Sequence, residues 1–193
     1  MSRTAAFDKQ AAIKAARDVF WRDGYAETAL PALEKATGLN RSSIYNTFGS
    51  KRGLFDAAVD NYLEEVVRPR LRPLLVDAVS PTALTDYITG LGHAFKALEH
   101  APGCLLVNAS GSGLAQDEQV CRVITDYLGE LRGAIARGVG AARPELGSTQ
   151  QTRLVDTITG LIISAFTLVR VDTTLAVDTL GTANDLLTGH DRT

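Results

Sequence analysis

Apolar residues recur at intervals of three and four positions over most of the chain, which is the spacing of one face of an α-helix. No stretch alternates convincingly between apolar and polar residues, and Asp23-Gly24 closes a helix rather than a hairpin. The pattern predicts an all-α chain. The predicted helices cover about residues 8–22, 29–37, 41–46, 51–66, 81–98, 104–108, 120–135, 149–171 and 174–188.

Glycine, proline and small polar residues separate these helices. A glycine follows each of the first three, at Gly24, Gly38 and Gly49, where a left-handed turn commonly ends a helix. Thr28 and Asn40 precede the second and third helices and are expected to cap them.

Ser50 is expected to cap the fourth helix, which Pro69 and Pro73 should kink or end. Ser80 followed by Pro81 predicts a new start, with proline at the first helical position.

Charge is divided unevenly along the chain, although the net charge is only −2. Residues 1–52 hold nine basic and five acidic side chains, a net charge of +4, and the remainder therefore carries −6. A basic module attached to an acidic body favours a polyanionic partner for the module. We expect two domains, residues 1–55 and residues 56–193.

Two short helices joined by a turn that contains Gly38 match the helix-turn-helix arrangement. Several residues in and around these helices make the motif more specific: Thr28, Gly38-Leu39-Asn40, Ser42-Ser43-Ile44-Tyr45, Phe48-Gly49-Ser50-Lys51 and Leu54-Phe55. Over about residues 7–55 this run resembles the DNA-binding domain of the TetR family of bacterial transcriptional repressors. Residues 56–193 resemble more loosely the family's helical ligand-binding and dimerising body. Glu34 and Pro31 depart from the family's usual residues.

The side chains expected to contact double-stranded DNA gather around the third helix. They are Thr28, Arg41, Ser42, Ser43, Tyr45, Thr47 and Lys51. Arg41 can pair with guanine through two hydrogen bonds, and Lys51 adds charge at a helix start that already favours phosphate. The resemblance implies phosphate contacts for Ser43 and Thr47. The alternative is that Tyr45 and Phe48 are core aromatics while the two basic residues are ordinary surface charges.

The helix expected at residues 149–171 is apolar on two sides, one containing Leu161 and the other Ile162. A helix of this kind needs two burying partners, so the last two helices are predicted to form a homodimer interface. The resemblance implies the same interface. Apolar periodicity is equally compatible with burial inside one larger bundle. A dimer would read a pseudo-palindromic operator with half-sites about 34 Å apart.

A small-molecule effector is expected to bind the second domain and to favour a spacing that releases DNA. Its candidate contacts combine aromatic surface with single polar groups: Phe95, Cys104, Asn108, Tyr127 and Phe166. Core packing is the alternative for each of them. Cys104 opens a helix, which suits a redox or electrophile sensor, but a buried unreactive thiol is the favoured interpretation.

Other function classes leave no signature in the sequence. There is no Gly-x-Ser-x-Gly, His-Glu-x-x-His, Cys-x-x-Cys or Gly-Lys motif, so no enzyme, metal site or cofactor is expected. His93 and His100 lie too far apart along a helix to share zinc. Two cysteines, no signal sequence and no membrane span indicate a cytoplasmic protein. A ligand-independent or activating DNA-binding regulator remains an alternative to the repressor.

Overall fold

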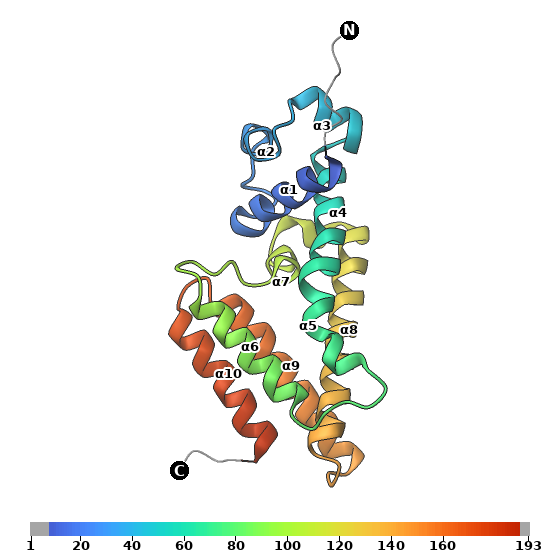
Figure 1. The fold of residues 1–193 in the computed structure, drawn as a ribbon, viewed down its shortest axis with the longest axis vertical. Coiled ribbons are helices and arrows are strands. Elements are labelled where there is room, and N and C mark those ends of the chain that lie inside the picture. The colour runs from blue at the N-terminus through green and yellow to red at the C-terminus, as the bar shows by residue number, and fades with distance from the viewer. Residues whose placement is uncertain (1–7, 190–193) are drawn as a thin grey trace. The chain divides into compact units, whose positions relative to one another are not determined.

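A computed structural model of the chain describes residues 8–189, which divide between two compact units, Met1–Val67 and Arg68–Thr193 (Figure 1). The prediction of an all-α chain is confirmed, since the described residues contain helices and no strand. The first unit holds α1 (Lys9–Asp23), α2 (Leu30–Thr37), α3 (Arg41–Phe48), α4 (Lys51–Tyr62) and the π-helical turn η1 (Leu63–Val67). The expected division after residue 55 stays a proposal, and α4 packs with the first unit.

An aromatic cluster joins α1 to α4 in the first unit. Phe20 of α1 and Phe55 of α4 are both buried, and their rings meet edge to face with centroids 5.2 Å apart. Tyr25, just beyond α1, completes the cluster, with its ring centroid 5.0 Å from that of Phe55. Buried edge-to-face pairs add stability beyond the area that they remove from water. The cluster holds α1 and α4 together, and α2 and α3 pack against these two helices.

The predicted caps of α3 and α4 are confirmed. The Asn40 side chain accepts a hydrogen bond from the Ser43 amide at 2.8 Å, and the Ser50 hydroxyl accepts one from the Gly53 amide at 3.0 Å. Each bond satisfies one of the amides that a helix start leaves without an intrahelical partner. These two caps set where α3 and α4 begin.

The predicted cap of α2 by Thr28 was wrong. The N-cap of α2 is Ala29, which offers no side-chain acceptor. The Thr28 hydroxyl turns back instead and donates a hydrogen bond to the Gly24 carbonyl at 2.5 Å, and the residue is buried. The Thr28 hydroxyl therefore bonds a carbonyl at the end of α1 instead of an amide at the start of α2.

Neither Pro69 nor Pro73 ends the helical path that begins at Lys51. The chain passes from α4 through η1 into α5 (Arg68–Leu75), and Pro73 lies inside α5. Proline supplies no amide hydrogen to the preceding turn. The π-helical turn stands immediately before the first proline, where the α-helical hydrogen-bond ladder must change.

Arg17 joins α1 to the π-helical turn. Its guanidinium is almost fully buried and donates to the Asn61 side chain at 2.9 Å and to the Glu65 carboxylate at 3.0 Å. It also pairs with Asp18 at 2.7 Å. A buried guanidinium is stable only when its donors are satisfied, so these contacts hold η1 against α1.

We expect replacement of Glu65 by glutamine to destabilise the protein at neutral pH and not at pH 3. The hydrogen bond from Asn61, assisted by Arg17, holds the pKa of Glu65 below its ordinary value of 4.5. A depressed folded-state pKa contributes stability above the unfolded pKa that is lost as pH falls. Thermal melts of both proteins from pH 7 to pH 3 should converge in acid. A melting difference that stays constant across this range would contradict the assignment.

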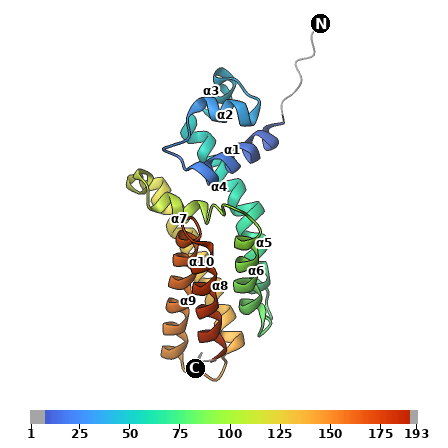
Figure 2. The ribbon, with the colours of Figure 1, turned by 90° about the vertical axis from the view of Figure 1, so that its left-hand side faces the viewer.

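The second unit is a helical bundle. Its elements are α5, α6 (Ala83–Lys96), α7 (Leu105–Ser110), η2 (Gly113–Gln116), α8 (Glu118–Ala142), α9 (Ser148–Leu168) and α10 (Thr173–Thr188). Helices α9 and α10 run side by side, with α6 packed on α10 and α8 on α9 (Figures 1 and 2). The short connection between α9 and α10 makes them an antiparallel pair.

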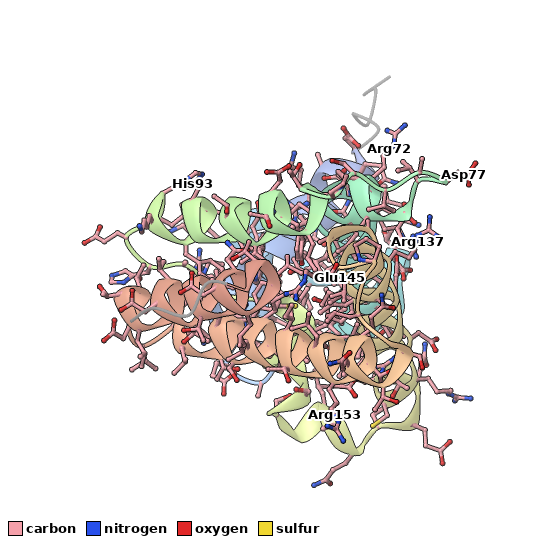
Figure 3. The ribbon with its side chains drawn as sticks, turned by 90° about the horizontal axis from the view of Figure 1, so that it is seen from below. Arg72, Asp77, His93, Arg137, Glu145 and Arg153 are labelled. Carbon is pink, nitrogen blue, oxygen red and sulfur yellow. The ribbon has the colours of Figure 1, made fainter. Side chains whose placement is uncertain are left out.

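Two predictions for α6 were wrong. The helix begins at Ala83 rather than Pro81, because the Ser80 carbonyl accepts the Ala83 amide in a turn and Thr82 becomes the N-cap. The helix also ends at Lys96 rather than at residue 98, so Leu98 is 53% exposed. His93 stands out from α6 into solvent (Figure 3).

Candidate DNA-binding site

The turn between α2 and α3 depends on Gly38. This residue has φ of +70°, in the left-handed region where a side chain is strained, and its amide closes α2 on the Glu34 carbonyl. Leu33, Leu39 and Ile44 are buried and fasten α2, the turn and α3 to the unit. Since the buried side of α3 is set by Ile44, the opposite side must face solvent.

That solvent-facing side carries the predicted contacts. Arg41, Ser42 and Tyr45 are exposed, while Ser43 and Thr47 are half-buried at its edges. The Arg41 guanidinium lies 5.6 Å from the centre of the Tyr45 ring, close enough for a cation–π contact. The structure therefore brings a basic group, a hydroxyl and an aromatic ring together on one turn of α3. The interpretation of Tyr45 as a core aromatic is not supported, since its side is open.

Lys51 lies at the start of α4 beside the aromatic cluster. Its ammonium nitrogen is 4.4 Å from the centre of the Tyr25 ring. Partial burial lowers the pKa of Lys51, and the nearby Glu27 carboxylate acts in the opposite direction. Amides at a helix start already attract anions, and the lysine adds a full charge there. This arrangement can bind a phosphate group.

Sequence reasoning missed two residues at this surface. Tyr25 supports the Lys51 ammonium, and Lys9 lies over the Phe48 ring with its nitrogen 5.6 Å from the ring centre. Both contacts join residues distant in sequence, so helical spacing gave no signal for them. Thr28 is the predicted contact that the structure separates most from the rest, since its hydroxyl is buried and bonded. Its contact with phosphate stays a prediction.

The five candidate ligand contacts lie in the second unit, where four of them form two buried pairs and the half-buried Asn108 bonds a backbone carbonyl. The Phe95 and Phe166 rings meet with centroids 6.0 Å apart. The Cys104 thiol donates to the Tyr127 hydroxyl at 3.4 Å, and both residues are buried. Asn108 donates to the Pro102 carbonyl at 2.8 Å. These side chains satisfy one another.

Gly103 explains why the residues around Cys104 pack so closely. A Cβ atom at this position would collide with the backbone carbonyl of Phe166, and the residue has φ of +72°. Only glycine allows this approach without strain. Cys104 is consequently held at the N-cap of α7 with no exposed surface, which fits the buried, unreactive interpretation.

Among residues 8–189, no helix is both long and apolar enough to span a bilayer. Nor do three histidine, cysteine or acidic side chains gather there as metal ligands would.

A left-handed glycine turn, a first helix fastened by the buried Leu33 and a second helix with an exposed basic and aromatic side define a helix-turn-helix protein. Residues 12–58 match the family described as bacterial regulatory proteins, tetR family. The HTH-type transcriptional repressor ComR of Escherichia coli (strain K12) is 33% identical over 107 residues, which cover 55% of this chain and 51% of ComR. The chain thus matches about half the length of that repressor. The uncharacterized HTH-type transcriptional regulator YezE of Bacillus subtilis (strain 168) is 28% identical over 75% of each chain.

Solved structures extend the likeness to the second unit. A cysteine mutant of the TetR family regulator CifR, in complex with a 26-base-pair operator DNA, has a TM-score of 0.77 and 28% identity. The match spans 94% of this chain and 98% of the CifR chain. Residues 12–58 of the chain therefore match the TetR family, and most of its length is similar to regulators of that family. The expectation that it is not an enzyme agrees with these relatives, which are regulators by description.

Proposed function

We propose that the protein is a repressor that binds a pseudo-palindromic operator as a homodimer and leaves it when a small molecule binds the second unit. The observation that carries the proposal is the open side of α3, where Arg41, Ser42 and Tyr45 lie together without covering residues. An exposed helix of this kind fits the major groove of B-form DNA. The CifR complex with operator DNA supports the same use of the fold. The protein would act in the cytoplasm.

The dimer is proposed to form through α9 and α10. Leu154, Leu161 and Leu168 repeat at seven-residue spacing on α9 and remain half-exposed in the single chain. Leu175 and Leu186 on α10 are 49% and 41% exposed. Large apolar side chains that stay open on two adjacent helices suit burial against the same helices of a second chain. Two copies of α3 would then read two half-sites.

The effector is proposed to act through differential affinity for two arrangements of the dimer. In one of these arrangements the two copies of α3 are spaced wrongly for the operator. A ligand that binds this arrangement more tightly lowers operator affinity by an amount set by its difference in affinity for the two arrangements. Phe95, Cys104, Asn108, Tyr127 and Phe166 stay candidates for a pocket that opens among them. Since their polar groups are now paired internally, such a pocket would require Tyr127 or Asn108 to exchange its partner.

We expect Arg41→Ala to relax base preference at one position of each half-site. A bidentate arginine–guanine pair contributes about 1–3 kcal/mol of discrimination, so preference there should fall by roughly ten- to hundredfold. Binding to unrelated duplexes should change much less. The measurement is selection from random DNA with the parent and the variant, and Lys14→Ala is the control because Lys14 acts on Glu65. An unchanged consensus would remove Arg41 from the base contacts.

A further inference from the structure

The second unit contains a groove between α5 and α6 that none of the five candidate ligand residues lines. Its volume is about 540 Å³, within the range of small-molecule sites. Helices α5 and α6 are in contact, and Figure 2 shows them side by side. The groove is open to solvent, so a ligand could enter without displacing a helix.

One wall of the groove is a rigid apolar surface. Pro69 and Pro73 are four residues apart on α5, which places their rings on the same face, and Val76 continues that wall. Proline rings have almost no rotamer freedom to lose when a ligand binds. Arg137 of α8 donates to the carbonyls of Leu74 and Val76 and so fixes the end of this wall. Figure 3 shows Arg137 on the same side as Asp77 of the α5–α6 connection.

The opposite wall comes from one face of α6. Tyr87 and Leu91 are separated by one turn, with Gly90 between them in the lining. A Cβ atom added to Gly90 would meet no atom within 4 Å. The glycine therefore leaves space in the groove that a side chain would occupy, although its helical backbone does not require glycine.

The polar groups of the groove favour one negative charge. Arg70 lines the groove, is exposed, and has no hydrogen-bond or ion-pair partner among residues 8–189. Burial and the Cys104 thiol raise the pKa of the Tyr87 hydroxyl, so this group stays neutral inside the unit and leaves Arg70 as the cationic group of the groove. Asp86 also lines the groove and accepts a hydrogen bond from Thr82 at 3.0 Å. Its carboxylate would repel any anion beside it, so an acid group is favoured only next to Arg70.

We propose that this groove, rather than a pocket among the five candidate ligand residues, is the effector site and that it takes a small organic acid with one negative charge and an apolar body. The acid group would lie against Arg70, and the apolar body would lie against Pro69, Pro73, Val76 and the Tyr87 ring. A guanidinium donates charge-assisted hydrogen bonds to a carboxylate or sulfonate. The inference rests on the proposed function only in naming the ligand as the effector, since binding itself can be measured without DNA.

The test uses the full chain and the monoanionic fluorescent probe 8-anilinonaphthalene-1-sulfonate. We expect saturable binding that octanoate displaces and octanamide does not. Arg70→Gln should weaken probe binding at least about tenfold, since a charge-assisted hydrogen bond is lost, and Gly90→Leu should abolish it by filling the groove. Matched controls should bind like the parent: Arg72→Gln, whose side chain projects outward from α5 (Figure 3), and Gly133→Leu, at an exposed position of α8 with open space.

Probe binding that is the same in Arg70→Gln, Gly90→Leu and the parent overturns the groove as the site, and so does equal displacement by octanoate and octanamide. Operator binding of each variant without probe is measured in parallel. If the parent fails to bind any operator, the proposed function fails, whatever the probe does. If the parent binds an operator and the probe binds the groove without altering operator affinity, the groove does not hold the effector.

Discussion

Replacing Leu161 with glutamate is expected to convert the dimer to monomers and to lower operator affinity by at least about a hundredfold. Leu161 is half-exposed on α9 in the single chain, in the middle of the leucines that we assign to the interface. A carboxylate at this place would have to be buried without a partner in the dimer, which costs far more than leaving it in water. Two linked half-sites gain about 10²–10⁴ in affinity over one, and a monomer loses that gain.

Sedimentation and operator titration of the same sample measure both parts of this prediction. Thr125→Glu adds the same charge at an exposed position of α8 and should leave the oligomeric state and the affinity unchanged. Melting temperature separates dissociation from unfolding, because a folded Leu161→Glu monomer keeps its helical signal. A Leu161→Glu protein that remains dimeric would place the interface elsewhere on the molecule.

The double variant Tyr45→Phe, Lys51→Ala should weaken binding to every duplex by roughly a hundredfold at fixed salt. A hydrogen bond to a charged group contributes about 1.5–3 kcal/mol, and the tyrosine hydroxyl adds a smaller neutral bond. Loss of one cationic contact also lowers the slope of log affinity against log salt by about one. Sequence preference should be retained, because phosphates carry no direct base information.

Affinity of the double variant is best measured on two unrelated duplexes at three salt concentrations. Lys14→Ala is again the matched control, since it removes a lysine of the first unit that acts on Glu65 rather than at the start of α4. Both proteins should melt near the parent, because Tyr45 is exposed and Lys51 makes no ion pair that the core depends on. A double variant with parental affinity at low salt would show that the start of α4 does not meet DNA.

The local features of the first unit were predictable from sequence because they depend on neighbours in the chain. Asn40 and Ser50 each cap the helix that follows, and an amide three residues away supplies the bond. Gly38 has the positive φ that its place after α2 requires. Thr28 does not cap α2 because its hydroxyl donates a hydrogen bond to the Gly24 carbonyl. No sequence pattern indicates which of two acceptable partners a hydroxyl takes.

The second unit was less predictable because its features arise between distant segments. Periodicity identified Phe95, Tyr127 and Phe166 as inward-facing, but it gave no information on whether they surround space or one another. In the structure the Phe95 ring packs on the Phe166 ring, and the groove that could hold a ligand lies between α5 and α6 instead. The end of α6 was misplaced for a simpler reason, since the apolar spacing continues to Leu98, which lies beyond the last helical residue.

The most direct test of the central claim is selection of bound fragments from random duplex DNA by the purified protein, with the parent and Arg41→Ala compared. We expect an inverted repeat whose half-site centres are separated by about one turn of the double helix, or a multiple of it. One position of each half-site should lose its base preference in the variant. Recovery of unenriched fragments, or of a single asymmetric site bound by one chain, would contradict it.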